Sequence, residues 1–220
     1  MLVVDRLVVA KELAMGARVL DIGGALMPET KEEDAFTKRY RQIRAGAAEY
    51  RVVDYQQKPG VDDIVDFNKP ESLEKIRGII GEYRPEVILA MEVLEHVNYH
   101  YEAMNELGRV VEQFVCVVWV TLPNNGSWFV NSQKSWTRDH SVAFLRDIAW
   151  RFVTRSGLGA HEVLAAPCMG HHVWWWPLVY AATFAQPMSW GFLVRPHSDG
   201  LKPGDDNERC LEEYTRRHFS

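Results

Sequence analysis

Acidic side chains stand at the ends of short apolar runs in the first half of the sequence. In the segment 18–25 an apolar run reaches Asp21, and Gly23 and Gly24 follow at once. Two glycines let the backbone turn sharply and approach a ligand closely, because they carry no Cβ. In open α/β sheets ligands bind at the carboxyl ends of strands, so the pattern is compatible with a nucleotide-like site beside Asp21 and equally with an ordinary strand-to-helix turn.

Two further acids occupy the same kind of position. Asp54 ends a second apolar run, where a carboxylate can accept hydrogen bonds from both hydroxyls of a ribose. Asp66 and Phe67 end a third, where an acid can accept from an exocyclic amine and an aromatic ring can cover a purine. A fourth run, 87–90, leads into the polar, helix-initiating segment Glu-Val-Leu-Glu-His at 92–96.

In this order, the four strand ends resemble those of class I S-adenosylmethionine-dependent methyltransferases of the small-molecule type. The resemblance covers residues 17–196, and the segment 92–96 is its most specific part. It implies S-adenosylmethionine as the cofactor and S-adenosylhomocysteine as the product. By position, the first acid and the glycines would hold the methionine end, the second acid the ribose, and the third acid with its aromatic neighbour the adenine. The implied cofactor-binding residues are Asp21, Gly23, Gly24, Asp54, Asp66, Phe67 and Met91.

The glycine turn departs from the pattern of this family. The family's loop commonly reads acid-x-Gly-x-Gly-x-Gly, but Ala25 and Met27 stand at the second and third glycine positions here, and Pro28 follows. The turn is therefore expected to have a different shape. The departure motivates an alternative in which the chain is a methyltransferase-like binding or scaffold protein without turnover.

The resemblance also implies the elements that position these residues. We expect a three-layer, Rossmann-like α/β sandwich, with a seven-stranded, mostly parallel sheet, an antiparallel last strand and helices on both faces. The valine-rich run 114–122 reads as a buried parallel strand, and 162–166 and 192–194 as the last two strands. Apolar stripes at helical spacing predict helices over 1–16, 99–112 and 139–155. A proline suited to a first turn predicts a helix over 70–83, and the polar, charged stretch 31–48 reads as the crossover helix.

One domain accounts for most of the chain, which has 220 residues. We expect a methyltransferase domain over 1–196, with substrate-capping segments at 123–140 and 167–190. A polar tail with a short helix follows over 197–220.

Histidine is the side chain best suited to remove a proton near neutral pH. A methyltransferase must align a nucleophile with an activated methyl group and, where needed, take its proton. Four histidines lie where the family places its substrate: His96, His140 and the pair His171 and His172. We expect the base among them, with His96, His140 and His171 as the catalytic candidates. Each has a structural alternative, since His96 can orient its loop and His140 can belong to a helix start.

Tryptophans gather in the two expected capping segments. Three consecutive ones, 174–176, cannot all face one side of a strand or helix, so some must meet a substrate pocket, a partner chain or the far face of the sheet. The expected substrate-binding residues are Glu92, Trp128, Trp136, His172 and Trp174. Such a pocket suits a ring or sugar face, which predicts a small-molecule acceptor methylated at oxygen or nitrogen. Because aromatic faces also stack on bases, nucleic acid stays an alternative acceptor, as does protein.

The composition of the chain limits which partners and which compartment we expect. The net charge of -5 gives no sign of a nucleic-acid footprint, although a local basic groove can hide in an acidic total. No apolar run approaches a membrane span, and the amino end lacks the layout of a secretory signal. Three widely spaced cysteines, Cys116, Cys168 and Cys210, indicate thiols of a reducing compartment and hence a cytoplasmic protein. The cysteine and histidines of 168–172 lack the spacing of a structural zinc site, so no metal is expected. A homodimer is compatible with the sequence.

Overall fold

The computed structural model describes residues 4–24, 35–97, 100–114, 116–123, 162–169 and 189–195. Its strands are β1 (Val4–Asp5), β2 (Arg18–Ile22), β3 (Glu49–Asp54), β4 (Asp63–Ile64), β5 (Val87–Met91), β6 (Val117–Pro123), β7 (Glu162–Met169) and β8 (Ser189–Arg195). Its helices are α1 (Arg6–Ala14), α2 (Ala35–Gly46), α3 (Ser72–Tyr83), the 3-10 turn η1 (Leu94–His96) and α4 (His100–Phe114).

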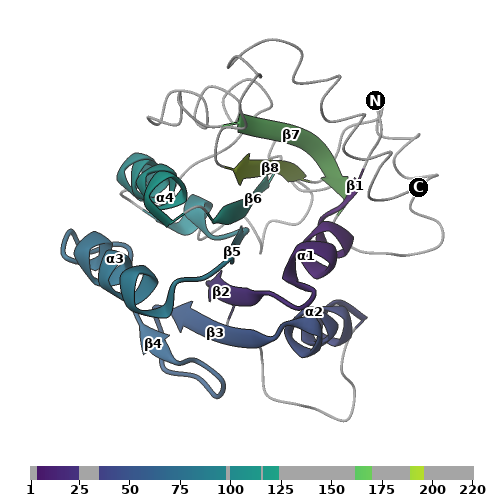
Figure 1. Cartoon of the computed structure of the whole chain (residues 1–220), viewed down its shortest axis with the longest axis horizontal. Coiled ribbons are helices and arrows are strands. Elements are labelled where there is room, and N and C mark those ends of the chain that lie inside the picture. The colour runs from purple at the N-terminus through teal and green to yellow at the C-terminus, as the bar shows by residue number, and fades with distance from the viewer. Residues whose placement is uncertain are drawn as a thin grey trace.

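These strands form a single eight-stranded sheet in the order β1-β7-β8-β6-β5-β2-β3-β4 (Figure 1). Neighbouring strands are parallel except around β8, which is antiparallel to both β6 and β7. The predicted mostly parallel sheet with an antiparallel last strand is therefore confirmed.

The predicted number of seven strands is wrong, because β1 adds a strand at the edge of the sheet beside β7. This strand has two residues and lies inside the segment 1–16, which was expected to be helical throughout. Two residues are too few to show the alternation that marks a strand. The run 114–122 is corrected in the same way: residue 114 ends α4, and the strand begins at Val117. β7 and β8 also occupy both ends of the expected capping segment 167–190.

Helices cover both faces of the sheet, as expected. Alternate side chains along β2 and β5 point to opposite faces, as the pleat of a strand requires. Leu20 and Ile88 pack with α3 and α4, whereas Val19 and Leu89 pack with α1 and α2. Helices α3 and α4 thus cover one face of the sheet and α1 and α2 the other (Figure 1), with an apolar layer under each pair.

The register of the sheet brings the carboxyl ends of its parallel strands to one edge. Ile22 lies beside Val53, Asp54 beside Ile64, and Met91 beside Thr121. The residues that follow β2, β3, β4 and β5 therefore share this edge, where open α/β sheets bind their ligands.

Asp5 begins α1 and ties it to α2. Its Oδ1 accepts hydrogen bonds from the backbone N–H groups of Leu7 and Val8, at 2.8 and 3.3 Å. Its Oδ2 accepts from Nη2 of Arg39 at 2.7 Å. One carboxylate thus satisfies two unpaired amides of the helix start and pairs with a charge on the neighbouring helix.

Asp5→Ala is expected to lower the free energy of unfolding by about 1–2 kcal/mol, the usual cost of losing a helix cap. Asp5→Asn keeps a capping oxygen but removes the charge, so it should lose clearly less. Urea unfolding measures both variants. Equal stability of Asp5→Ala and the unaltered chain would show that the cap contributes nothing.

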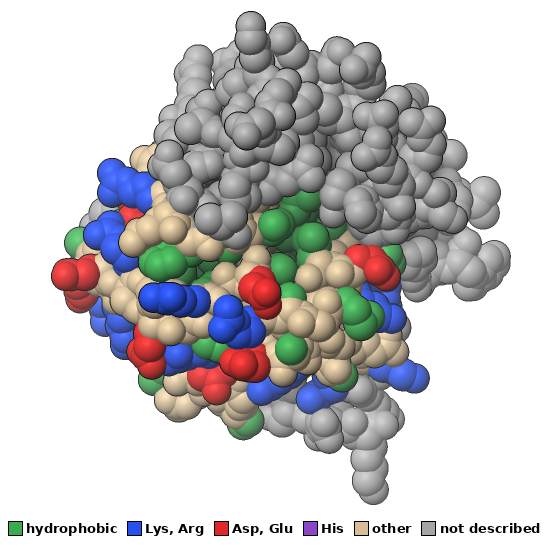
Figure 2. Space-filling model, in the orientation of Figure 1, with side chains coloured by type: hydrophobic (Ala, Val, Ile, Leu, Met, Phe, Trp, Pro, Cys, Tyr) green, Lys and Arg blue, Asp and Glu red, His purple; other side chains and the backbone are tan. Residues whose placement is uncertain are grey.

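The surface of the described residues carries charges of both signs. On the face shown in Figure 2, Lys and Arg side chains alternate with Asp and Glu, without a broad patch of either sign among the coloured residues. In the part of the chain that the structure describes, no helix combines the length and apolar character needed to cross a membrane.

Candidate functional site

The turn after β2 depends on both of its glycines. Gly23 has a left-handed backbone, with φ +78°, and its N–H donates to the carbonyl of Val53 at 2.7 Å. A Cβ at this position would lie 2.0 Å from Cγ2 of Val93. At Gly24 a Cβ would lie 1.9 Å from Oδ2 of Asp21. The turn therefore packs its backbone directly against two neighbours, which leaves no room for a side chain.

Asp21 lies beneath this turn with no exposed surface. Its Oδ2 accepts hydrogen bonds from the hydroxyls of Tyr40 and Tyr50, at 2.7 and 2.6 Å. Its buried Oδ1 has no hydrogen-bond partner among the described residues. Asp21 was predicted to hold the cofactor, and the structure buries it under the glycine turn that Gly23 and Gly24 form.

Burial raises the pKa of Asp21 to about 6. Removal of a carboxylate from water disfavours its charged form, and the charge of Asp54 acts in the same direction. The two tyrosine hydrogen bonds and the charge of Arg44 oppose the rise. Burial, followed by the charge of Asp21, raises the pKa of both tyrosines well above its usual value, so both hydroxyls stay protonated donors.

Asp54 ends β3 and is almost fully buried. Its Oδ1 accepts from the backbone N–H of Gln56 at 2.9 Å, while its backbone carbonyl accepts from Val65 N–H at 2.9 Å. No described residue donates a hydrogen bond to Oδ2. One oxygen is thus fixed by the backbone, and the other is left to accept from a hydroxyl group.

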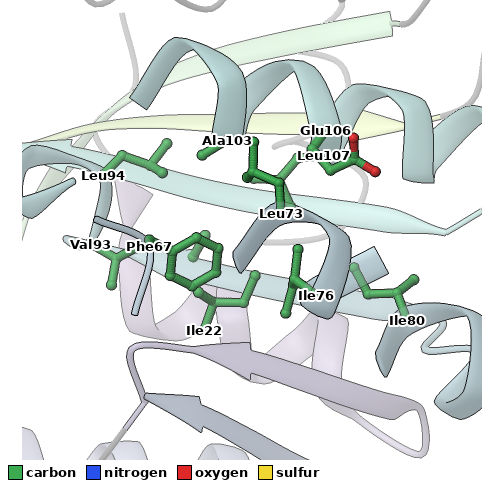
Figure 3. Close-up of a pocket in the computed structure, with 11 residues that line it drawn as sticks. Ile22, Phe67, Leu73, Ile76, Ile80, Val93, Leu94, Ala103, Glu106 and Leu107 are labelled. Atoms are coloured by element: carbon green, nitrogen blue, oxygen red, sulfur yellow. The ribbon is translucent and has the colours of Figure 1, made fainter. Parts of the chain in front are cut away.

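Asp66 and Phe67 follow β4. Oδ1 of Asp66 accepts from the backbone N–H of Asn68 at 3.0 Å, and Oδ2 lies 3.7 Å from Nζ of Lys69. The Phe67 ring lines an apolar pocket between the sheet and helices α3 and α4 (Figure 3). Ile22, the last residue of β2, and Val93, in the turn after β5, line the same pocket. An aromatic ring and an acid therefore adjoin at this edge of the sheet.

The turn after β5 contains a strained residue held by a buried arginine. Glu92 has a left-handed backbone, with φ 55°, which is uncommon for a residue with a Cβ. Its N–H donates to the carbonyl of Thr121 at 3.0 Å, and its Oε1 lies 2.8 Å from Nη1 of Arg6. Nη1 of Arg6 also donates to Oγ of Ser189 at 3.1 Å. Helix α1 is thereby connected to the end of β5 and to the start of β8.

Glu95 and His96 stand next to each other but in different surroundings. The Glu95 side chain is almost completely buried, and burial, followed by the charge of Glu92, raises its pKa well above the usual range. The His96 side chain is 45% exposed, with Nε2 4.0 Å from Oε1 of Glu95. Solvent and an approaching molecule can therefore reach His96, whereas Glu95 favours its neutral form.

The predicted residues divide into two groups. The seven cofactor candidates, together with Glu92 and His96, lie at or just beyond the carboxyl ends of β2, β3, β4 and β5. The remaining candidates, His140, His171, Trp128, Trp136, His172 and Trp174, lie outside the described residues. In the described ranges no three His, Cys, Asp or Glu side chains converge as a metal site would require.

Three residues of this region were missed by the sequence analysis: Arg6, Tyr40 and Tyr50. Their partners lie far along the chain: Tyr40 and Asp21 are 19 positions apart, and Arg6 and Ser189 are 183 positions apart. Local spacing carries no signal for such contacts. A polar residue inside an expected apolar stripe, as Arg6 is, was the one available hint.

Arg6→Met is expected to lower the free energy of unfolding by about 3 kcal/mol, because it leaves the charge of Glu92 partly buried without its partner. Arg6→Met combined with Glu92→Gln should recover much of the loss. Urea unfolding of the single and double variants measures the coupling. If Arg6→Met unfolds like the unaltered chain, the ion pair makes no net contribution.

No family profile matches this sequence, and no curated protein matches it. The likeness to known proteins is structural. A SAM-dependent methyltransferase from Archaeoglobus fulgidus aligns over 87% of this chain and 94% of its own, at 12% identity and a TM-score of 0.51. An S-adenosylmethionine-dependent methyltransferase from Mesorhizobium loti aligns over 86% and 95%, at 11% identity and a TM-score of 0.51.

The third structure contains the reaction product of such enzymes. The N-methyltransferase NodS from Bradyrhizobium japonicum, in complex with S-adenosyl-L-homocysteine, aligns over 88% of this chain and 85% of its own, at 11% identity and a TM-score of 0.50. At these identities the likeness concerns the backbone alone. The chain has the fold of S-adenosylmethionine-dependent methyltransferases.

Proposed function

We propose that this protein is an S-adenosylmethionine-dependent methyltransferase that methylates an oxygen or nitrogen of a small molecule. The observation that carries the proposal is the edge at which β2, β3, β4 and β5 end. At this edge, β2 is followed by a glycine turn, β3 ends on a carboxylate with one oxygen left to accept, and β4 is followed by an acid and an aromatic ring. Each suits one part of the cofactor.

The groups at this edge have the chemistry that the parts of S-adenosylmethionine require. The turn at Gly23 and Gly24 lets the backbone approach the methionine end. Oδ2 of Asp54 can accept from a ribose hydroxyl. Asp66 can accept from the adenine amine and Phe67 can cover the ring, while Met91 would lie against the cofactor. When bound, the cofactor supplies an activated methyl group.

The chain itself must then orient an acceptor and take its proton. His96 suits proton removal, because its imidazole is exposed at the end of β5, next to the proposed cofactor residues. His140 and His171 remain proposed bases, and Trp128, Trp136, His172, Trp174 and Glu92 the proposed acceptor-binding residues. Glu92 would contribute through the shape of its turn as well, since its carboxylate already pairs with Arg6.

Two observations favour a small-molecule acceptor: the tryptophans of the expected capping segments and the mixed charge of the surface. The face in Figure 2 mixes both signs of charge among its described residues, whereas a phosphate-binding groove would concentrate positive charge. The proposal places the enzyme in the cytoplasm, on the cysteine usage of the sequence. The glycine replacements Ala25 and Met27 favour the second candidate, a cofactor-binding scaffold without turnover.

Calorimetric titration with S-adenosylmethionine and S-adenosylhomocysteine tests the proposal. We expect both to bind at micromolar concentration, and adenosine alone to bind more weakly because it lacks the methionine end. Absence of binding would contradict the cofactor assignment. A screen of small acceptors with isotopically labelled methyl donor then separates the two candidates, because the scaffold would bind the cofactor and label nothing.

A further inference from the structure

Two tyrosine hydroxyls from different elements meet at one carboxylate oxygen beneath the glycine turn. Tyr40 comes from α2 and Tyr50 from β3, and both donate to Oδ2 of Asp21 in β2, at 2.7 and 2.6 Å. Apolar packing alone does not require either hydroxyl, since a phenylalanine ring would fill nearly the same space. The structural role of the two hydroxyls is therefore their hydrogen bonds to the carboxylate.

The same oxygen also meets the turn. A Cβ on Gly24 would lie 1.9 Å from Oδ2 of Asp21, so the Gly24 backbone rests directly against the carboxylate. Any displacement of the carboxylate must move the turn, and the neighbouring Gly23 N–H would lose its bond to Val53 O. The buried Oδ1 has no described hydrogen-bond partner, so within the described residues the tyrosines hold this side chain through one oxygen.

We infer that Tyr40 and Tyr50 are positioning residues, which act through Asp21 to hold the glycine turn in the shape that accepts a ligand at the ends of β2 and β3. For the identity of that ligand, the inference rests on the proposed function. The tyrosines themselves do not contact the ligand in this arrangement; they fix the group on which the turn rests.

The charges around Asp21 determine how this arrangement depends on pH. Arg44 of α2 favours the ionised carboxylate, and Asp54 of β3 disfavours it. The charge of Arg6 of α1 acts on Tyr40, and the residue of β5 beside Asp21 is the apolar Leu89. The tyrosine hydrogen bonds lower the pKa of Asp21, so loss of either hydroxyl raises it. Protonation weakens both bonds, because hydrogen bonds to a charged acceptor are about twice as strong as neutral ones.

The test is the pH profile of S-adenosylhomocysteine binding by calorimetry, from pH 5 to pH 8.5. We expect the affinity of the unaltered protein to fall on the acid side, with a midpoint near pH 6. In Tyr40→Phe and Tyr50→Phe this midpoint should rise by about one pH unit, which lowers the affinity at intermediate pH by up to about tenfold. The same ligand is used throughout, so its own ionisation cancels between variants.

Tyr83→Phe is the matched control. The Tyr83 hydroxyl donates to the carbonyl of Val19 at 3.2 Å, on the same strand as Asp21 but away from the carboxylate. This variant loses one tyrosine hydrogen bond to β2, yet its binding profile should coincide with that of the unaltered protein. A shift as large as those of Tyr40→Phe and Tyr50→Phe would overturn the inference, as would no shift in either of those variants.

Amide hydrogen exchange without ligand separates this inference from the proposed function. The Gly23 N–H is protected by its bond to Val53 O, and we expect the protection to be lost at a higher pH in the two variants than in the unaltered chain. That result would support the inference even if S-adenosylhomocysteine failed to bind, which would count against the proposed function alone. Unchanged protection would overturn the inference. If Tyr40→Phe does not fold, Tyr50→Phe carries the test.

Discussion

Asp54→Ala is expected to abolish detectable binding of S-adenosylhomocysteine while leaving the fold intact. The variant removes the one oxygen at the end of β3 that the backbone leaves to accept, together with the charge. Oδ2 has two lone-pair sites, so it can accept from both ribose hydroxyls. These would be two charge-assisted hydrogen bonds, each worth about 1.5–3 kcal/mol. Their combined loss corresponds to a drop of more than about 100-fold in affinity, which calorimetry registers as an absent signal.

The control for this variant lies on the same strand. Glu49→Ala removes an exposed carboxylate at the opposite end of β3 and should bind like the unaltered protein. Circular dichroism and urea unfolding establish that Asp54→Ala is folded. If the folded variant keeps its affinity, Asp54 does not bind the ribose.

Asp21→Asn is expected to change how stability depends on pH. In the unaltered protein, the contribution of Asp21 to stability should fall as pH rises, whereas the affinity for S-adenosylhomocysteine should increase. Burial raises the pKa of Asp21 from its ordinary 3.8 to about 6, so the folded protein holds this proton more tightly than the unfolded chain does. The contribution of Asp21 to the free energy of unfolding therefore falls as pH rises from 4 to 6. The fall amounts to about 3 kcal/mol, at about 1.4 kcal/mol for each unit of pKa difference.

Asparagine carries no such charge, so the variant should lack this decline. Relative to Asp21→Asn, the unaltered protein should lose about 3 kcal/mol of stability between pH 4 and pH 7. Urea unfolding at unit intervals of pH measures the difference, and parallel curves would contradict the raised pKa. Binding of S-adenosylhomocysteine at pH 7 should be weaker in the variant, even where the variant is the more stable protein.

The positions of the strand-end residues could be predicted from the sequence for a physical reason. Parallel strands buried on both faces are continuous apolar runs, and the first polar residue after each run marks its carboxyl end. Asp54 was placed in this way, and the structure has it at the last residue of β3. Met91 was expected just past the run 87–90, and the structure makes it the last residue of β5. Because adjacent parallel strands end at the same edge of the sheet, knowing where each strand ends is enough to predict that these residues lie close together.

The contacts that support these residues could not be predicted in the same way. Tyr50 reads in the sequence as the first residue of an apolar run, and nothing in that run shows that its hydroxyl reaches Asp21 on the neighbouring strand. Arg6 lies in a stripe that reads as helical, and its partners Glu92 and Ser189 belong to distant segments. Tertiary packing decides such contacts, and the local period of hydrophobicity does not encode them.

The buried Arg6 has a consequence for how the chain is made. Synthesis proceeds from the amino end, yet Ser189, which accepts from Arg6, comes 183 residues later, and β1 pairs with β7. Helix α1 therefore leaves the ribosome long before the strands that complete its surroundings. Before β7 and β8 have been made, Arg6 can already pair with Glu92, but its hydrogen bond to Ser189 and the pairing of β1 with β7 must wait for these later strands.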